Sequence, residues 1–454
     1  MKNPLFVGDP GFVEAPEWTR DLVIYEINPY AFTSPNGAGD GSGSGTFNGL
    51  REKLSYLEDL GITGIWLAGF SESTAHFYGI KTVYACVRPD RLDAALGTPE
   101  EFKAMIDEAH HRGIRVFLDA ITHGVVNGSP LIAEHPNWFK GGTWGMTDYD
   151  YENAEFREWW IKLWTNYVLE YGVDGYRLDV PRHNQVPLWN AIAGRCAEAG
   201  HPIVIFPELT VLYHFCQRDY VGFSNDMAGE FNPMPQYVGG QISCHDDGWL
   251  SGPGNYYKVK GHRASLVYTM FGYNIPIFMA GEEFNADQVS LPNLARDLYG
   301  GGGPGGWLYG SWIQWDQLND QQHRDMLNDF KKVLAIRREN RDVLHADRAA
   351  THILRVPHSP PCKPMPYVRF IPGEKAIVVV ANSSHDEAET HVFTLDIPLA
   401  DMGLNGNGSY RVTDLWRKQV STVTEAELHN YKLSVPSASV VDGGGRAIKI
   451  EPAR

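Results

Sequence analysis

The sequence predicts an α/β protein built on a (β/α)₈ TIM barrel, with a small inserted subdomain after the third strand and a C-terminal antiparallel β-sandwich. Two observations predict this fold. Short apolar runs alternate with stretches of helical periodicity over roughly 320 residues, which is typical of parallel strands covered by helices, and eight such repeats predict a closed barrel. After residue 344 the pattern changes to strand-like runs separated by Gly, Asn and Asp turns, which predicts a sandwich.

The expected barrel strands are short runs rich in β-branched and apolar residues. They lie at 22–27, 62–67, 114–119, a run that begins at 172 and ends at 179, 202–206, 221–224, 241–243 and 275–279. In the sandwich we expect strands at 376–380, 391–395, 410–413 and 439–441.

Helix signals fall between these strands. Apolar residues recur at helical spacing over 48–60, and Gly61 follows as a stop signal. Thr98 and Glu101 predict a capping box with Pro99 at the first helical position. A wide apolar stripe over 156–167 predicts a further helix.

The domain boundaries follow from these patterns. We expect the catalytic barrel to comprise residues 1–123 and 151–344, and the sandwich to comprise residues 345–454. Residues 124–150 are too many for a simple turn, and they contain several proline and aromatic residues. We therefore expect a lid-like subdomain there.

Composition excludes several classes of partner. A formal net charge of −16 argues against nucleic acid and anionic membranes, which both bind basic surfaces. Five cysteines without CxxC spacing predict neither a disulfide framework nor a zinc site. The N-terminal residues lack the apolar core of a signal peptide, and no run of about 18 apolar residues predicts a membrane span. We therefore expect a cytoplasmic protein without a cofactor.

Charged residues gather where the predicted strands end. Arg177 and Asp179 lie two apart, so their side chains point the same way from one strand, and the arginine orients the carboxylate. The alternative is a buried ion pair that only fixes the strand. The other strand ends carry further ionisable residues, namely Asp119, His123, His183, Glu208, His245, Asp246 and Asp247. A barrel brings all of these to one rim.

Crowded carboxylates can divide their roles in catalysis. One of them acquires a raised pKa and can donate a proton, while the arginine-paired carboxylate stays ionised and can attack. Hydrolysis of a glycosidic bond requires these two roles. Metal-assisted hydrolysis is the alternative use of such a cluster, but no HxH or HExxH motif lies at the strand ends.

These residues resemble glycoside hydrolase family 13, the α-amylase family, over the whole chain. Four short blocks occur in the family's order, at 119–123, 175–183, 206–209 and 243–246, with two subsidiary blocks at 45–50 and 281–284. The resemblance implies a retaining mechanism in which Asp179 is the nucleophile, Glu208 is the general acid/base and Asp246 stabilises the transition state.

The resemblance also implies substrate-binding roles. Arg177 orients Asp179, His123 and His245 bind the sugar at the cleavage site, and Tyr78 stacks on it. Arg182 and His183 match positions that contact the sugar beyond the scissile bond.

Three departures from the family pattern qualify this expectation. Thr122 stands where an Asn helps to bind calcium, so we expect no metal there. Gly79 follows Tyr78, where exo-acting members carry Asp, which favours a linear, branched or cyclic oligosaccharide over a single-glucose pocket. The block at 146–150 fits no subfamily signature, so α-1,4 and α-1,6 linkages both stay open.

Small malto-oligosaccharides are therefore the expected substrates, and the cyclomaltodextrinases and hydrolases of cyclic maltosyl-maltose are the members of the family that fit best. Such relatives imply a possible homodimer. Two alternatives stay open. The run at 244–247 has some similarity to transglycosylases and isomerases of the sucrose or trehalose type. A non-catalytic sugar-binding protein would lack a catalytic carboxylate.

Overall fold

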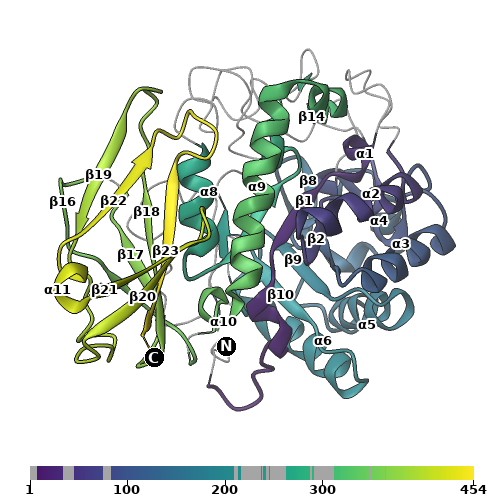
Figure 1. Cartoon of the computed structure of the whole chain (residues 1–454). Coiled ribbons are helices and arrows are strands. Elements are labelled where there is room, and N and C mark those ends of the chain that lie inside the picture. The colour runs from purple at the N-terminus through teal and green to yellow at the C-terminus, as the bar shows by residue number, and fades with distance from the viewer. Residues whose placement is uncertain are drawn as a thin grey trace.

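The computed structural model of the chain describes residues 8–33, 45–74, 83–208, 213–215, 237, 239–241, 245, 262–286, 289–290, 311–347, 349–362 and 364–453. Within these residues the central element is a parallel sheet of seven strands in the order β10-β9-β5-β2-β1-β12-β11 (Figure 1). Its strands are β1 (Ile24–Ile27), β2 (Gly64–Leu67), β5 (Arg115–Ile121), β9 (Gly175–Asp179), β10 (Val204–Pro207), β11 (Gly239–Gln241) and β12 (Ile275–Met279).

The strand order confirms the sequential parallel arrangement expected of a barrel. Strands β1, β2, β9, β10 and β12 are buried at every residue, as near-continuous apolar runs in α/β sheets are. The predicted strand at 221–224, which would follow β10 in the chain, lies outside the described residues.

Helices cover the sheet on its outer side. The longer ones are α2 (Phe47–Leu60), α3 (Pro99–His111), α5 (Ala154–Tyr171), α6 (Val186–Glu198), α8 (His262–Phe271) and α9 (Gln321–Glu339). The predicted capping box is present, since Thr98 accepts from Glu101 N and Glu101 accepts from Thr98 N. Gly61 ends α2 with φ 97°, a left-handed conformation that favours glycine. None of the described helices combines the length and hydropathy that a membrane span requires.

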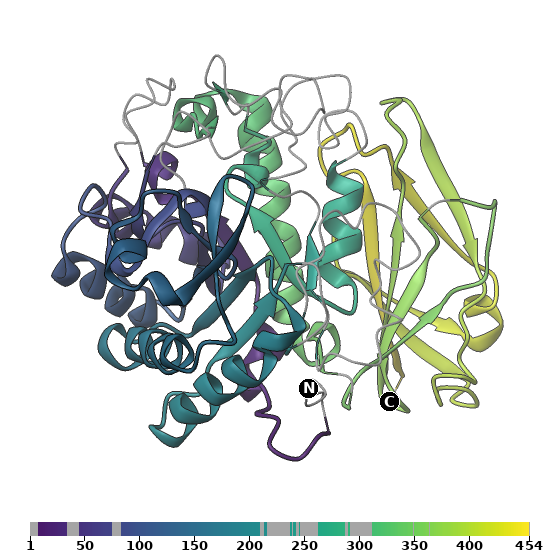
Figure 2. The ribbon, with the colours of Figure 1, turned by 180° about the vertical axis from the view of Figure 1, so that it is seen from behind.

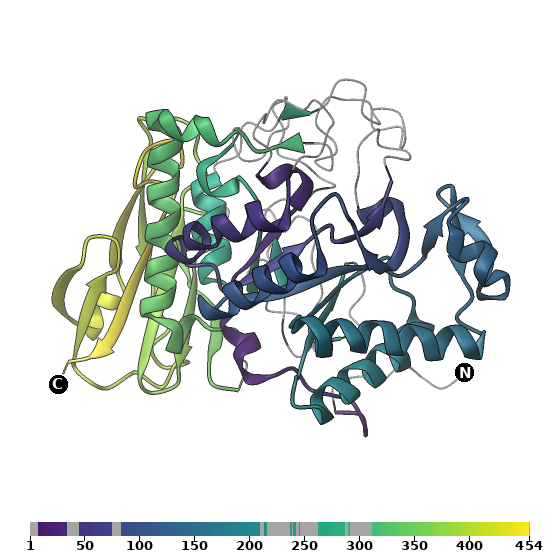
Figure 3. The same ribbon diagram turned by 90° about the vertical axis from the view of Figure 1, so that its right-hand side faces the viewer.

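Two small sheets lie beside the carboxyl ends of the barrel strands. β3 (Ser71–Ser73) pairs with β4 (Cys86–Leu92). β6 (Gly124–Val126), β7 (Phe139–Thr143) and β8 (Met146–Tyr149) form an antiparallel sheet in the order β6-β8-β7, with the short helices α4 (Pro130–Glu134) and η3 (Pro136–Trp138) in its connection. Figure 3 shows this second sheet projecting from the barrel strands.

The C-terminal part is an antiparallel β-sandwich, as the sequence predicts. Its larger sheet has the order β15-β17-β18-β23-β20-β21 and its smaller sheet the order β16-β19-β22. The strands are β15 (His352–Arg355), β16 (His358–Ser359), β17 (Tyr367–Ile371), β18 (Lys375–Ala381), β19 (Thr390–Leu395), β20 (Ser409–Asp414), β21 (Gln419–Thr424), β22 (Tyr431–Pro436) and β23 (Gly445–Pro452). The short helix α11 (Glu425–Leu428) connects β21 to β22.

One predicted sandwich strand is wrong. Residues 439–441 form part of the turn between β22 and β23, not a strand. The reason is local: Gly443 N donates to Val440 O, Asp442 adopts φ 59°, and the side chain of Val441 is 53% exposed. Consecutive β-branched residues predicted a strand, but the glycines that follow them favour the turn.

Helices α8 and α9 lie between the parallel sheet and the sandwich (Figures 1 and 2). Tyr367 donates its hydroxyl to Tyr268 O at 2.8 Å, and Tyr268 donates its own to Met365 O at 2.9 Å. These hydrogen bonds join α8 to β17 of the larger sheet and to the residues just before it. Short elements complete the described chain: η1 (Glu17–Asp21), α1 (Pro29–Phe32), η2 (Val83–Ala85), η4 (His183–Gln185), η6 (Glu282–Phe284), β13 (Val289–Ser290), β14 (Ser311–Trp312), η7 (Trp315–Asn319) and α10 (Arg341–Leu344).

Candidate active site

A buried guanidinium organises the carboxyl ends of three neighbouring strands. Arg177 on β9 is fully buried, and its Nη1 donates to Asp179 Oδ1 at 2.7 Å and to Asp119 Oδ1 at 3.1 Å. Asp119 is the register partner of Arg177 on β5, so the parallel pairing itself places the two side chains together. Arg177 Nη2 also lies 3.6 Å from Glu208 Oε2.

Glu208 follows β10 directly and is bound to the backbone beside Asp179. Its Oε2 accepts a hydrogen bond of 3.0 Å from Val180 N, and its own amide donates to Leu178 O at 3.0 Å. Val180 adopts φ 42°, which is unusual for a β-branched residue. Such strain between two charged groups points to a position fixed by the surrounding structure for function.

Thr122 fixes the backbone at the same place. Its hydroxyl lies 2.6 Å from Asp179 O and 3.1 Å from Val180 O, so it is placed to donate to either carbonyl. Its own carbonyl accepts from Tyr151 Oη at 2.7 Å and from Gln185 Nε2 at 3.4 Å. Both polar groups of Thr122 are therefore engaged in hydrogen bonds within the protein.

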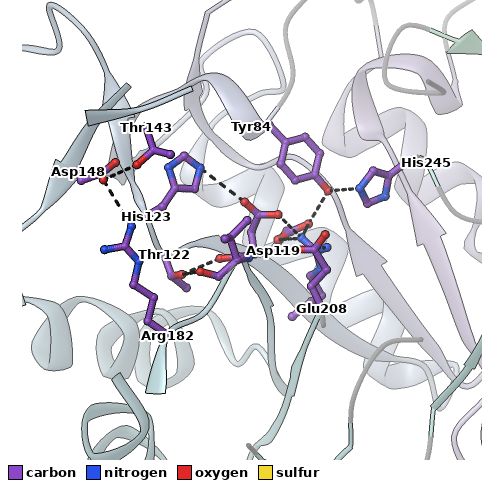
Figure 4. Close-up of polar contacts among 12 residues, drawn as sticks. Tyr84, Asp119, Thr122, His123, Thr143, Asp148, Arg182, Glu208 and His245 are labelled. Carbon is purple, nitrogen blue, oxygen red and sulfur yellow. Dashed lines mark hydrogen bonds and ion pairs between the residues drawn. The ribbon is translucent and has the colours of Figure 1, made fainter. Parts of the chain in front are cut away.

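The other side of the cluster is built around Asp119 and His245 (Figure 4). Asp119 Oδ2 accepts from Trp66 Nε1 at 3.1 Å and from Tyr84 Oη at 2.9 Å. The Tyr84 hydroxyl also lies 3.0 Å from His245 Nε2, and the two rings stack at 5.1 Å. His245 Nδ1 forms a close hydrogen bond with Glu26 on β1. Tyr84 thus connects Asp119 to the histidine that precedes Asp246.

The inserted sheet supplies further groups. His123 follows β5, and its Nε2 lies 3.7 Å from Asp179 Oδ2. The ring of Trp144, in the turn between β7 and β8, meets the His123 ring edge to face at 5.2 Å. On β8, Asp148 Oδ2 accepts from Thr143 at 2.5 Å and lies 3.4 Å from Arg182 Nη2. Figure 4 shows His123, Asp148 and Arg182 on the same side of Asp119.

Burial dominates the electrostatics of this cluster. It raises the pKa of Asp179 well above its usual value; Arg177 opposes the shift, while the charges of Glu208 and Asp119 add to it. Burial also raises the pKa of Asp119. We had expected pairing with Arg177 to keep Asp179 ionised, but one guanidinium faces three carboxylates, and desolvation outweighs the pairing. Burial lowers the pKa of His123 to about 4, so its imidazole is neutral at pH 7.

The structure brings together most of the predicted site residues. Asp179, Glu208, Arg177, His123 and His245 lie in one network. Arg182 is linked to it by its ion pair with Asp148, and its side chain is 51% exposed. His183 is exposed in η4 and, in the described part of the chain, forms no hydrogen bond or ion pair with the network. Tyr78 and Asp246 lie outside the described residues.

Sequence reasoning missed Glu26, Trp66, Tyr84 and Asp148 as members of this network. Glu26 carried a signal, because a carboxylate near the end of an otherwise apolar strand is costly to bury without a partner. Tyr84 carried none, since a tyrosine in an irregular segment is usually a core or surface residue. Its role depends on the approach of β4 and its preceding turn to the sheet.

The residues around Thr122 do not fit a metal ion. The Thr122 hydroxyl donates to backbone carbonyls, and its carbonyl already accepts two hydrogen bonds. In the described part of the chain, no group of three or more His, Cys, Asp or Glu side chains is arranged to hold a metal. The absence of calcium stays a prediction.

Comparison with known proteins agrees with this fold. Residues 27–129 match the α-amylase catalytic domain, and residues 370–441 match the C-terminal β-sandwich domain of α-galactosidase. An alpha-amylase of Geobacillus thermoleovorans, solved in complex with acarbose, superposes with a TM-score of 0.73 over 96% of this chain and 99% of that one, at 17% identity. The chain therefore resembles the α-amylase family in its fold and, over residues 27–129, in its sequence.

Sequence relatives in the α-amylase family are distant but extend over most of the chain. The intracellular maltogenic amylase of Bacillus subtilis is 24% identical over 403 residues, which cover 75% of this chain and 65% of that protein. The cyclomaltodextrinase of Thermoanaerobacter pseudethanolicus is 21% identical over 453 residues, which cover 84% of this chain and 74% of that protein. The predicted resemblance to the α-amylase family and the predicted barrel fold are thereby confirmed. Because the chain spans only 65% of the length of the B. subtilis relative, its own activity is a proposal.

Proposed function

We propose that this chain is a member of the α-amylase family and a retaining hydrolase of α-glucosidic bonds in small malto-oligosaccharides, with Asp179 as nucleophile and Glu208 as general acid/base. One observation carries the proposal: a single buried guanidinium, Arg177, contacts carboxylates at the ends of two adjacent strands. Two carboxyl groups held at one rim are what retaining hydrolysis requires.

The proposed reaction has two steps. Asp179 attacks the anomeric carbon while Glu208 gives its proton to the leaving glycosidic oxygen, so a glycosyl ester forms and the glycosidic bond breaks. Glu208 then takes a proton from water, the water oxygen attacks the same carbon, and Asp179 leaves as a carboxylate. Arg177 holds Asp179 in line for both displacements.

The raised pKa of Asp179 is compatible with its role as nucleophile and with Glu208 as proton donor. The negative charge of Glu208 is one cause of that raised pKa. When Glu208 holds the proton, this contribution disappears and ionisation of Asp179 becomes easier. The charge state that can react is the one with the proton on Glu208 and with Asp179 ionised.

The remaining roles rest on the family motifs and on partial geometry. Asp246 would stabilise the positive charge that develops on the sugar, and its neighbour His245 is fixed by Tyr84 and Glu26. His123, neutral and 3.7 Å from Asp179, would bind a hydroxyl of the same sugar. Tyr78 would stack on that sugar, while Arg182 and His183 would contact the next one.

The names of the relatives support the substrate class. They are called maltogenic amylase and cyclomaltodextrinase, which favours linear or cyclic malto-oligosaccharides with α-1,4 or α-1,6 bonds. One of them is called intracellular, which supports a cytoplasmic location for this chain.

A product profile tests the activity. Purified protein is incubated with linear, branched and cyclic α-glucans, and the products are separated by chromatography. Released malto-oligosaccharides of retained anomeric configuration are expected. No release from any glucan contradicts the proposal, and transfer products that dominate over hydrolysis make the protein a transglycosylase instead.

Two variants test the roles of the carboxyl groups. Asp179→Asn should lose activity by about a thousandfold or more on every substrate. Glu208→Gln should lose as much on oligosaccharides but retain activity on α-glucosyl fluoride, whose leaving group needs no proton. A matched control is Asp174→Asn, which removes a buried carboxylate at the opposite end of the same strand segment, bound to Arg115 at 2.9 Å. Full activity of Glu208→Gln on oligosaccharides contradicts the assignment.

A further inference from the structure

A small cavity at the opposite end of the barrel has an unusual lining. It has a volume of about 210 Å³ and lies where α9 ends, beside α10 and the beginning of β1. Figure 1 shows α10 at the end of α9, on the side of the barrel away from β14. Its ionisable lining residues are Arg337, Arg338, Arg341, His345 and Asp21. Three arginines thus face one carboxylate in a chain whose net charge is −16.

Arg337 is the most informative of these residues. Its side chain is buried, with 5% of the residue exposed, and its Nη1 donates to Met270 O at 2.6 Å. Among the described residues its Nη2 has no hydrogen-bond partner, and Asp21, whose charge acts on Arg337, is paired with Arg341. Burial lowers the pKa of Arg337 to about 10. A buried guanidinium without an anionic partner is costly, and an anion in the cavity would offset that cost.

The neighbouring charges reinforce this positive site. Arg369, also fully buried, donates to Gly272 O at 2.8 Å and to Thr351 Oγ1 at 2.8 Å. Its charge helps to lower the pKa of His345. His345 Nε2 is a second buried nitrogen that has no hydrogen-bond partner among the residues that the structure describes. Burial lowers the pKa of His345, so the neutral imidazole can donate one hydrogen bond.

The cavity has room beside these donors. Gly61 lies on its wall and has no side chain to occupy it. A Cβ at Gly61 would lie 3.7 Å from Arg338 Nη1, so it would fill part of the space beside that guanidinium. Arg341 Nη2 lies 3.3 Å from Asp21 Oδ2, at the more exposed side, where the Arg341 side chain is 69% exposed. One buried guanidinium with two more accessible ones matches the way in which proteins bind oxyanions, by charge-assisted hydrogen bonds.

Helix capping is the simpler explanation of these arginines. Arg337 and Arg369 do bind carbonyls at the end of α8, and cations favour helix C-termini. Capping does not, however, use Arg337 Nη2 or His345 Nε2, and it does not require Arg338 and Arg341 at the same cavity. The lining is better matched to a ligand with several anionic oxygens.

We propose that this cavity binds a small dianionic oxyanion, either inorganic phosphate or the phosphate group of a monoester. Arg337 and His345 would contact the buried oxygens, and Arg338 and Arg341 the outer ones. Three arginines against one aspartate leave two positive charges, which match a dianion. The site is separate from the proposed catalytic carboxylates, so the inference does not depend on the proposed function.

Isothermal titration calorimetry with inorganic phosphate, at constant ionic strength adjusted with sodium chloride, tests the proposal on the full-length protein. Saturable binding of one phosphate is expected. The double variant Arg338→Gln/Arg341→Gln, which changes two exposed side chains, should weaken binding at least tenfold. Asp21→Asn removes the opposing carboxylate and should strengthen binding severalfold, a direction that general damage to the fold would not produce.

Two controls complete the design. Arg112→Gln removes an arginine that pairs with Glu58 on α2 and Glu108 on α3 and does not line the cavity, and it should bind phosphate as the wild type does. Glu208→Gln should also bind phosphate unchanged. Titration with glucose 6-phosphate distinguishes a monoester from the free ion. No binding of either ligand, equal binding by the double variant, or weaker binding by Asp21→Asn would overturn the proposal.

Discussion

One buried guanidinium, that of Arg177, is shared by three carboxyl groups, those of Asp119, Asp179 and Glu208. This arrangement suits the proposed hydrolysis but lowers the stability of the folded protein. Because burial raises the pKa of Asp179, the folded protein disfavours its ionised form. The unfolded chain ionises an aspartate above about pH 4, so the cost appears as pH rises through that value and persists at neutral pH.

Asp179→Asn should therefore stabilise the protein while it abolishes hydrolysis. We expect the free energy of unfolding at pH 7 to rise, because the variant no longer has to bury an ionised carboxylate. The gain should vanish below about pH 4, where the wild-type carboxyl group is protonated in both states. Thermal denaturation of both proteins from pH 4 to pH 8 measures this difference. A lower midpoint for the variant at every pH would contradict the burial argument.

Thr122 is a positioning residue whose hydroxyl fixes the carbonyls of Asp179 and Val180. Thr122→Val keeps the shape but removes the side-chain donor to the carbonyls of Asp179 and Val180, while Thr122 N still donates to Asp179 O at 3.4 Å. We expect kcat to fall about tenfold or more with little change in KM, because the nucleophile is displaced while sugar-binding groups remain. Thr122→Ser restores the hydroxyl and should recover most of kcat, which a purely structural role of the methyl group would not predict.

At the scale of single elements, the hairpin between β7 and β8 has a tryptophan at a turn position that favours asparagine. Trp144 and Gly145 have φ values of 51° and 73°, as a two-residue type I′ turn requires, and such turns favour Asn-Gly. A tryptophan there costs about 1 kcal/mol or more relative to asparagine. It is nevertheless 48% exposed and touches His123, so its ring is available to a sugar face.

Trp144→Asn should separate the two effects. The variant should gain about 1 kcal/mol in unfolding free energy from the preferred turn, and its KM for malto-oligosaccharides should rise about tenfold with the loss of the aromatic surface. Steady-state kinetics and denaturant titration measure these quantities. Leu169→Asn, which changes an equally exposed apolar residue on α5, serves as the control and should leave KM unaltered. An unchanged KM for Trp144→Asn would remove the ring from the substrate site.

How far the sequence predicts these elements depends on how local their signals are. The capping box at Thr98 and the glycine stop at Gly61 need only neighbouring residues, and both appear as predicted. Residues 439–441 were predicted as a strand from their β-branched side chains, although the glycines that follow them favour the turn that the structure shows. In the site, Arg177 beside Asp179 follows from strand periodicity, whereas Tyr84 joins Asp119 only through the folding of a distant segment.

At the scale of the whole molecule, the barrel and the sandwich meet through α8 and α9. Asp329 on α9 connects this helix to α8 and to the sandwich. Its carboxylate accepts from Arg263 Nε on α8 at 2.5 Å and from Asp442 N, in the turn between β22 and β23, at 3.2 Å. Nearby, Cβ atoms at Gly444 and Gly445 would lie 2.6 Å from Ala264 N and 2.5 Å from Val267 Cγ1. The sandwich backbone therefore packs directly against α8.

Asp329→Ala should weaken this junction more than any surface pair does. Removing one partner of a buried ion pair costs about 3–5 kcal/mol, and the amide of Asp442 loses its acceptor as well. Asp329→Asn keeps an acceptor for that amide and should cost less. The matched control is Asp59→Ala. It breaks an exposed ion pair between Asp59 on α2 and Lys331 on α9, the helix that carries Asp329, and it should cost less than about 1 kcal/mol.

Calorimetry then shows whether the junction makes the two parts unfold as one. We expect a single transition for the wild type and for Asp59→Ala, because the packed interface couples the barrel to the sandwich. For Asp329→Ala we expect the midpoint to fall and the transition to broaden or divide, since the sandwich retains its own apolar core between its two sheets. A single transition at the wild-type midpoint would mean that the apolar contacts of α8 couple the two parts without the ion pair.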